Sequence, residues 1–305
     1  MTTLIIHHDA CLAHDPGPQH PESPARLKAV LGALEELPHT ERLPAPLATT
    51  EAIERAHPGD YWRAIVAAGP ADDRVALDPD TLLSPGSIDA ALRGAGAACF
   101  AVEQVLGGRA QNAFCAVRPP GHHAEADRAM GFCLLNNAAI AARHAQAACG
   151  LERIAILDFD VHHGNGTQAI FESSPDVLYV SSHQVPLYPG TGSADEVGQG
   201  NILNLPLSPG SGSREFRRAW TQSGLPALHA FRPEFIIFSA GFDAHALDPL
   251  GQIELVEDDF TWITTAVREY AEQQCAGGLI SILEGGYHLD ALAASAAAHV
   301  AALTN

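Results

Sequence analysis

The stretch IAILDFDVHHGNG, residues 154–166, joins an apolar run to side chains that can bind metal and move protons. The apolar run is typical of a strand buried on both faces. Residues two apart in extended backbone point to the same side, so Asp158, Asp160 and His162 would share a face if the strand continues that far. Carboxylates and an imidazole at this spacing can bind one divalent cation. Taken alone, the stretch could also be an Asp-rich turn whose histidines bond to backbone.

Three further polar clusters follow apolar runs: RPPGHH at 118–123, SAGFDAH at 239–245 and EGGYH at 284–288. A metal bound by Asp160, His162 and Asp243 would keep open positions for water and substrate, as a catalytic site requires. His122 and His123 have the ordinary pKa range for acid and base chemistry at neutral pH. The phenol of Tyr287 could donate a hydrogen bond to an oxyanion. Together these groups could carry out amide hydrolysis. Taken alone, His122 and His123 could be a surface pair, and Tyr287 could be a packing side chain.

The elements that must position these clusters alternate along the chain, as in proteins with a parallel sheet. We expect a single α/β domain over residues 1–305, with a central, mostly parallel, doubly wound sheet flanked by helices. The expected strands are residues 3–7, 113–117, 154–158, 177–181, 202–205, 234–239 and 279–283. The expected helices are residues 24–37 with Ser23 as N-cap, 87–106, 131–148, 258–272 and 289–302. The proline-rich pieces 43–47 and 205–209 are expected to be loops. The four clusters then lie at carboxyl ends of strands, where α/β sheets bind ligands.

Composition narrows the possible partners. The chain has 17 Lys and Arg against 36 Asp and Glu, a formal net charge of -19, which disfavours nucleic acid and suits a cationic substrate or simply solubility. No apolar run approaches the roughly 20 residues of a membrane-spanning helix, and the N-terminus is typical of a first strand rather than a signal peptide. The six cysteines lack C-x-x-C spacing, so we expect reduced thiols in a cytoplasmic protein. The sequence predicts no particular oligomeric state.

The motifs RPPGHH, GFC, DFDVHHGNGTQ, YPGTG, SAGFDAH and EGGYH, in this order between residues 20 and 288, resemble the signature set of the histone deacetylase family, in its class II and bacterial branch. The resemblance implies the arginase/deacetylase fold and a mononuclear Zn²⁺ site, with Fe²⁺ as a possible substitute, at Asp160, His162 and Asp243. It assigns catalysis to His122, His123 and Tyr287. It further implies that Asp158 orients His122 and that Asn165 lies opposite His123, where class I members carry Asp. An amide polarises His123 less than a carboxylate would, so the pKa of His123 should be lower.

The resemblance also implies sites around the catalytic groups. A structural K⁺ is expected near Asp158, Asp160, His162, Ser181 and Ser182. Gly131 and Phe132 match the wall of an acyl-lysine channel, whose opposite aromatic wall could come from the loop carrying His183 and Tyr188. Arg26 resembles a buried arginine at an exit cavity for acetate, and a helix-surface arginine is its alternative.

Rival functions remain within and beyond this family. Arginase-like enzymes use two Mn²⁺ ions, but Gly164 and His245 stand where the additional carboxylates would be needed. Leu250, seven residues after Asp243, replaces the gatekeeping Glu of eukaryotic polyamine deacetylases, which favours removal of acetyl or other acyl groups from the ε-amine of acyl-lysine. Deacylation of polyamines or other small acylated amines stays the alternative. A non-catalytic sensor of metal or acyl groups has no need for Tyr287.

Overall fold

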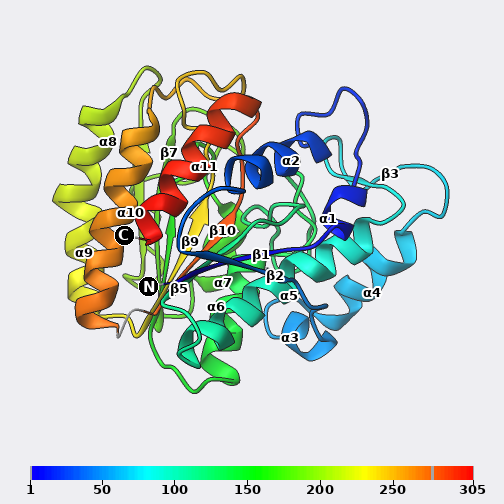
Figure 1. Ribbon diagram of the computed structural model, residues 1–305, viewed down its shortest axis with the longest axis horizontal. Coiled ribbons are helices and arrows are strands. Elements are labelled where there is room, and N and C mark those ends of the chain that lie inside the picture. Colours follow the sequence, from blue (N-terminus) through cyan, green and yellow to red (C-terminus); the bar gives the residue numbers. More distant parts are fainter. Residues whose placement is uncertain (1, 276–277, 305) are drawn as a thin grey trace.

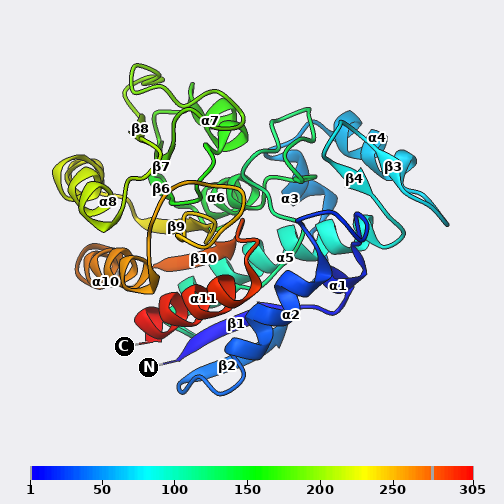
Figure 2. The same cartoon turned by 90° about the horizontal axis from the view of Figure 1, so that it is seen from above.

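The computed structural model describes residues 2–275 and 278–304, and within them an eight-stranded parallel sheet runs through the molecule (Figure 1). Its strands lie in the order β2-β1-β5-β10-β9-β6-β7-β8, so neighbours in the sheet are mostly distant in sequence. A separate pair of antiparallel strands, β3 and β4, lies beside α4 (Figure 2). The strands are β1 Thr3–His7, β2 Thr40–Pro44, β3 Val75–Ala76, β4 Leu82–Leu83, β5 Asn112–Cys115, β6 Ile154–Asp158, β7 Val177–Gln184, β8 Ile202–Leu207, β9 Phe235–Ala240 and β10 Leu279–Leu283.

Helices cover both faces of the sheet, as Figures 1 and 2 show: α2, α10 and α11 on one face, and α5, α6 and α7 on the other. This arrangement confirms the predicted doubly wound α/β domain. The helices are α1 Ala10–Ala13, α2 Pro24–Ala33, α3 Thr50–Glu54, α4 Gly59–Ala68, α5 Ser87–Leu106, α6 Asn137–Ala147, α7 Asn165–Phe171, α8 Ser213–Ala219, the π-helical turn η1 Trp220–Gly224, α9 Leu225–Phe231, α10 Glu257–Gln274 and α11 Leu289–Thr304.

The central strands consist of apolar residues because both of their faces are buried. In β6 every residue from Ile154 to Asp158 is buried, and Asp158 is paired with Ser181 of β7 and Ser239 of β9. β6 and β9 therefore end within one residue of each other, and β7 continues three residues further, to Gln184. The polar loops that follow β6 and β9 begin at one edge of the sheet.

Several predicted boundaries were wrong. Residues 43–47 were expected to be loop, but Leu43 and Pro44 belong to the edge strand β2, which is too exposed to carry an apolar run. The expected loop 205–209 likewise overlaps β8, which continues to Leu207. The helix expected at 131–148 begins only at Asn137, because the preceding residues form a turn in which Phe132 has a positive φ of 69°. Ser23 does precede α2, but its side chain makes no capping bond, and α2 ends at Ala33.

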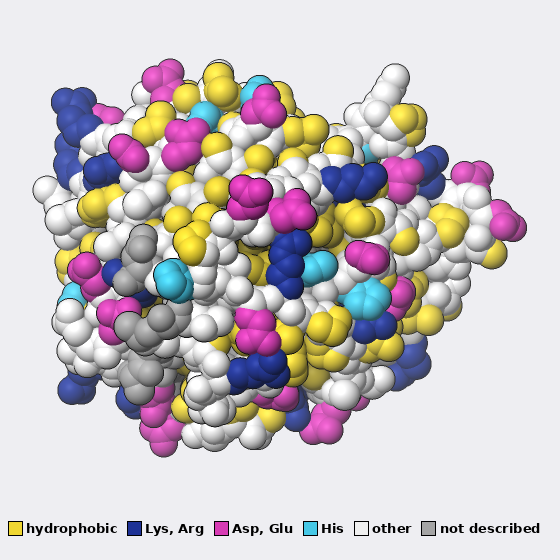
Figure 3. Space-filling view, viewed as in Figure 1, with side chains coloured by type: hydrophobic (Ala, Val, Ile, Leu, Met, Phe, Trp, Pro, Cys, Tyr) yellow, Lys and Arg dark blue, Asp and Glu magenta, His cyan; other side chains and the backbone are white. Residues whose placement is uncertain are grey.

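The surface carries charges of both signs. On the face drawn in Figure 3, acidic and basic side chains are interspersed among apolar ones, with a group of basic side chains over α8, which contains Arg214, Arg217 and Arg218. In the described part of the chain, no helix combines the length and apolar character needed to cross a membrane. All six cysteines, each within the described residues, are free.

His299 of α11 gives the fold a built-in sensitivity to acid. The imidazole is fully buried and bonds to the hydroxyls of Thr264 (2.5 Å) and Ser281 (2.7 Å). Its ring lies 5.6–5.8 Å, centroid to centroid, from four phenylalanine rings: Phe114, Phe159, Phe238 and Phe242. Burial lowers the pKa of His299 to about 3.

We expect this histidine to reduce stability as the pH falls. Between pH 6.5 and about 3 the unfolded chain binds a proton at His299 that the folded chain does not, so the free energy of unfolding should fall by about 1.4 kcal/mol per pH unit from this residue. The measurement is urea unfolding of wild type and His299→Gln at pH 7, 5.5 and 4.5. The variant should be less stable at pH 7 but should lose less stability on acidification. Parallel pH curves would contradict the assignment, since all other titrating groups are common to both proteins.

Candidate active site

The loops that follow β5, β6, β9 and β10 meet at the carboxyl edge of the sheet and are bonded directly to one another. The Glu284 carboxylate, just after β10, accepts the N–H of Gly121 (2.6 Å) from the loop after β5. Asp243, after β9, accepts the N–H of Val161 (2.8 Å) from the loop after β6. The N–H of Gly285 also donates to Oδ2 of Asp160 (2.9 Å), which connects these two pairs of loops. The four polar clusters therefore lie around one place.

Asp160, His162 and Asp243 form a buried group in which potential ligand atoms lie within 4.8 Å of one another. The strand β6 ends at Asp158, so Asp160 and His162 come together through a turn rather than through continued strand geometry. Nδ1 of His162 is 3.1 Å from Oδ1 of Asp160 and 3.1 Å from Oδ2 of Asp243. A Cβ at Gly285 would overlap the carboxylates of both aspartates, so only glycine leaves them room. Two carboxylate oxygens and one imidazole nitrogen suit a divalent cation such as Zn²⁺.

The charges in this group also favour a cation. Burial and the nearby charge of Asp160 raise the pKa of Asp243 to about 7. Burial alone would lower the pKa of His162, but its bonds to the two aspartates raise it to about 10. Without a metal, protons must therefore offset the repulsion between the carboxylates. A divalent cation would offset it with two charges and displace those protons.

The two adjacent histidines have different partners. Nδ1 of His122 lies 3.0 Å from Oδ2 of Asp158, and Nδ1 of His123 lies 2.9 Å from Oδ1 of Asn165. Asp158 also accepts a hydrogen bond from the hydroxyl of Tyr179 (2.9 Å), which holds the carboxylate in place. In both histidines Nδ1 donates to an oxygen, so Nε2 is the nitrogen left for chemistry.

The surroundings of the two histidines shift their pKa values in opposite directions. Burial alone would lower the pKa of His122, but the charges of Asp160 and Asp158 raise it to about 10. Burial lowers the pKa of His123 well below its usual range, and the neighbouring His122 and His162 lower it further. His123 is therefore neutral at pH 7 and can accept a proton, whereas His122 carries positive charge, which a bound cation beside Asp160 would reduce.

Tyr287 contributes to the same cavity as His123 and His162. Behind its ring lies Arg26, whose guanidinium carbon is 4.8 Å from the ring centroid. Arg26 is fully buried and donates to the carbonyl oxygens of Glu284 and Gly286, both at 2.5 Å, so it is not a helix-surface arginine. The guanidinium thus supports the loop that carries Tyr287.

A cavity of about 260 Å³ leads to these groups. Its walls include the three expected channel residues Gly131, Phe132 and Leu250. Tyr188, rather than His183, supplies the second aromatic wall; His183 is buried and bonded to Ser181 (2.8 Å) and to the carbonyl of Gly192 (2.9 Å). Asp80 adds a carboxylate to the lining.

Ser181 and Ser182, expected near a structural cation, are buried on β7 beside Asp158. The Ser181 hydroxyl bonds to His183, and the Ser182 hydroxyl accepts from the indole N–H of Trp220 (3.0 Å). Ser181 and Ser182 therefore lie near Asp158, as expected. Among the described residues, the one group of three or more acidic, histidine or cysteine side chains that could bind a metal ion is Asp160, His162 and Asp243.

Sequence reasoning missed several residues of the site. Glu284 accepts the N–H groups of Gly121 and His122, and burial raises its pKa to about 7. Tyr179 lies inside an apolar strand, and Asp80 lies in the β3–β4 hairpin, far from every motif in sequence. Only Glu284, which opens the EGGYH cluster, carried a signal that could have been read.

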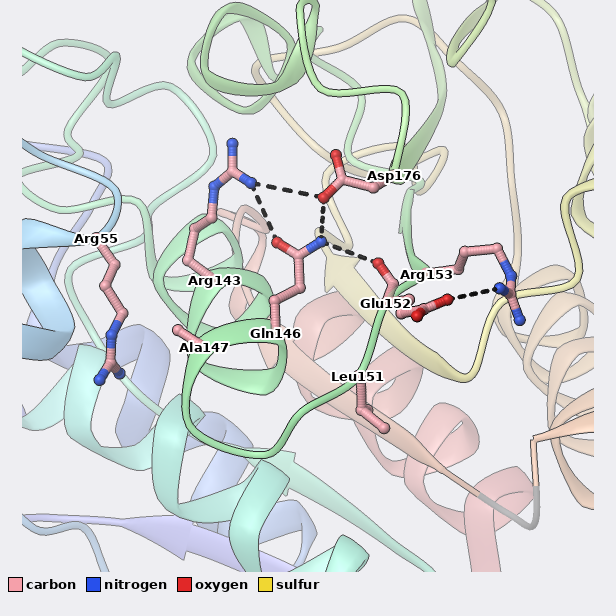
Figure 4. Close-up of a pocket in the computed structure, with 8 residues that line it drawn as sticks. All are labelled: Arg55, Arg143, Gln146, Ala147, Leu151, Glu152, Arg153 and Asp176. Atoms are coloured by element: carbon pink, nitrogen blue, oxygen red, sulfur yellow. Dashed lines mark hydrogen bonds and ion pairs between the residues drawn. The ribbon is translucent and has the colours of Figure 1, made fainter.

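A larger hollow of about 710 Å³ lies at the opposite edge, before β6 and β7 (Figure 4). Its charged groups are paired with one another: Arg143 lies 4.0 Å from Asp176, and Arg153 lies 3.5 Å from Glu152. The neutral Gln146 bonds to both Arg143 (3.1 Å) and Asp176 (2.5 Å). Because these charges are already paired within the protein, few of them are free to bind a substrate. We therefore place the active site in the smaller cavity, which contains His123, His162 and Tyr287.

Comparison with known proteins places the chain among deacetylases. The model of the histone deacetylase domain matches residues 20–303. The histone deacetylase-like amidohydrolase of Pseudomonas aeruginosa is 42% identical, covering 88% of this chain and 72% of that protein. A probable deacetylase of Archaeoglobus fulgidus is 38% identical, covering 95% and 82%. The crystal structure of the HDA15 HD domain matches with a TM-score of 0.93 and 36% identity, covering 99% of this chain and 88% of that one.

The parallel α/β fold and these relatives define a hydrolytic deacetylase. The chain belongs to the histone deacetylase family, which confirms the resemblance of its motifs. The family is generally metal-dependent, and the buried Asp-His-Asp group is where this chain could hold the metal.

Proposed function

We propose that this protein is a Zn²⁺-dependent amidohydrolase that removes acetyl or other acyl groups from the ε-amine of acyl-lysine. The observation that carries the proposal is the cavity lined by His123, His162 and Tyr287, with Asp160 and Asp243 bonded to His162. Asp160, His162 and Asp243 would hold one Zn²⁺, or Fe²⁺ in its place. The bound cation would supply Lewis acidity, which lowers the pKa of water and polarises a carbonyl.

The protein's own groups divide the remaining work. Neutral His123, whose Nδ1–H is directed to Asn165, can accept the proton of the attacking water at Nε2. The same nitrogen then returns a proton to the leaving amine as the amide C–N bond breaks, giving a carboxylate and a free amine. His122, paired with Asp158, stabilises negative charge nearby, and the Tyr287 hydroxyl donates to the oxyanion.

The shape of the channel supports a linear substrate. Phe132 and Tyr188 provide aromatic walls for an aliphatic stem, and Leu250 adds an apolar contact rather than a carboxylate that would select a second ammonium group. Asp80 could accept an N–H group of the substrate. Because Asp80 and the net charge of -19 would also attract a polyamine, small acylated amines remain the second candidate.

Further parts of the proposal rest on the family resemblance. A K⁺ near Asp158, Asp160, His162, Ser181 and Ser182 would stabilise the ends of β6 and β7. Arg26 would lie beside the path by which acetate leaves. A cytoplasmic location remains a prediction, with which the six free cysteines agree.

We expect an acetyl-lysine peptide to be hydrolysed faster than acetylputrescine. The reason is that the described channel offers one apolar and two aromatic walls and no carboxylate at Leu250. The measurement is kcat/KM for a parallel panel of acyl-lysine peptides and acylated polyamines. A higher kcat/KM for the polyamines would replace the lysine proposal with the small-amine alternative, and no hydrolysis of either class would remove both.

A further inference from the structure

The turn that follows Asp243 contains a second buried carboxylate, Asp248, which is bonded to the loop of Tyr287. Oδ2 of Asp248 accepts the backbone N–H of Tyr287 at 2.6 Å and that of His288 at 3.1 Å. Oδ1 accepts the N–H of Leu250 at 3.0 Å. Asp248 is only 7% exposed, so these bonds are largely shielded from water. One carboxylate therefore connects two residues that line the channel, Leu250 and Tyr287.

The rest of the Tyr287 loop is held from the other side. Gly285 donates its N–H to Oδ2 of Asp160 (2.9 Å), and Arg26 binds the carbonyl of Gly286. Gly286 has a φ of +122°, a conformation that glycine adopts without the strain of a side chain. Two successive glycines place little restraint on the backbone before Tyr287. The bonds to Asp248 supply that restraint immediately after them.

We propose that Asp248 is a positioning residue for deacylation: its carboxylate fixes the backbone of Tyr287 so that the phenol hydroxyl stays directed into the channel. This inference rests on the proposed function, in which Tyr287 is the oxyanion donor. A donor displaced by about 1 Å can cost on the order of 100-fold in rate, so a backbone anchor so close to the phenol bears directly on turnover.

A carboxylate suits this position better than an amide. Both of its oxygens accept, so it can serve Leu250 and the Tyr287–His288 pair at once. An asparagine would direct its NH₂ group against one of the two sets of N–H donors. Asp248→Asn therefore removes part of the anchor with little change in shape, and Asp248→Ala removes all of it.

The test is a double-mutant cycle on the zinc-loaded protein, with wild type, Asp248→Asn, Tyr287→Phe and the double variant. Asp248→Asn should lower kcat for an acetyl-lysine peptide about 10-fold, with KM changed less than about threefold and zinc content unchanged. In the Tyr287→Phe background the same substitution should cost less than about twofold, because the hydroxyl that it positions is absent. Asp248→Ala should lower kcat about 100-fold.

Asp259 provides a matched control. Its carboxylate is fully buried and accepts the N–H of Val256 (3.1 Å), the hydroxyl of Ser213 (2.6 Å) and the guanidinium of Arg217 (2.7 Å). Asp259→Asn should lower the unfolding temperature while kcat stays within about twofold. If this control loses as much kcat as Asp248→Asn, the loss reflects any missing buried carboxylate and the proposal is overturned.

The cycle distinguishes a failure of the positioning role of Asp248 from a failure of the oxyanion role of Tyr287. If Tyr287→Phe is impaired but Asp248→Asn costs the same fold in both backgrounds, Asp248 does not act through Tyr287 and the positioning role alone is rejected. If Tyr287→Phe turns over like wild type, the oxyanion role in the proposed function fails first. Unchanged kcat in both Asp248 variants would also reject the positioning role.

Discussion

Tyr287→Phe should lower kcat by about 100- to 1,000-fold, corresponding to roughly 2.7–4 kcal/mol of transition-state stabilisation, while zinc content stays at the wild-type level. The hydroxyl is the part of Tyr287 that can donate to an oxyanion, and the substitution removes only that group. Phenylalanine keeps the ring that packs against Arg26 and faces Phe132 at 6.0 Å between centroids. The measurement is single-turnover and steady-state hydrolysis of an acetyl-lysine peptide, with metal analysis of the same samples.

Phe132→Leu is a useful comparison for this experiment. It alters the apolar channel wall without removing a donor, so its effect should fall mainly on KM. Wild-type kinetics for Tyr287→Phe would exclude the phenol from the mechanism. A loss of zinc in that variant would instead show that Tyr287 supports the metal group.

Asp243→Ala should reduce bound zinc to below about a tenth of an equivalent and abolish measurable deacylation. The substitution leaves two protein ligands, which is too few for a catalytic zinc site of this type. It also removes the acceptor for the N–H of Val161 and so loosens the contact between two loops. Zinc content by elemental analysis and product formation should fall together.

The exposed Asp195 offers the control for this prediction, since it lies on the surface with its carboxylate bonded to Ser193. Asp195→Ala should retain full zinc and activity. Retention of zinc by Asp243→Ala would show that the cation is held elsewhere.

The sequence predicted the central strands well because a strand buried on both faces must be apolar. The run before Asp158 and the run before Glu284 both correspond to such strands. The order of strands could not be read from these runs, since adjacent strands such as β5 and β10 are far apart in sequence. The edge strand β2 was missed because its residues are largely exposed and carry no apolar pattern.

The grouping of the candidate site followed from one physical rule, that loops after parallel strands meet at one edge. That rule places Asp243 near His162 without any knowledge of distances. It does not reach residues whose position depends on tertiary folding, such as Tyr179 within β7 or Asp80 in the β3–β4 hairpin. It also left open the choice between His183 and Tyr188, which depends on how their loop turns.

Glycines of the motifs show a second limit of sequence reasoning. Gly285 is required because a Cβ would overlap Asp160 and Asp243, and Gly131 because one would overlap His123. Both requirements come from contacts with residues distant in sequence. A glycine in a motif therefore indicates close approach, but its partner is visible only in the fold.

The central claim is that one divalent cation, bound by Asp160, His162 and Asp243, makes this protein a deacylase. The most direct test removes all metal with a chelator and then titrates Zn²⁺ back while acetate release from an acetyl-lysine peptide is followed. We predict that activity rises linearly and stops rising at one equivalent of Zn²⁺ per chain. Activity that persists without metal, or that requires two equivalents, would contradict the mononuclear site.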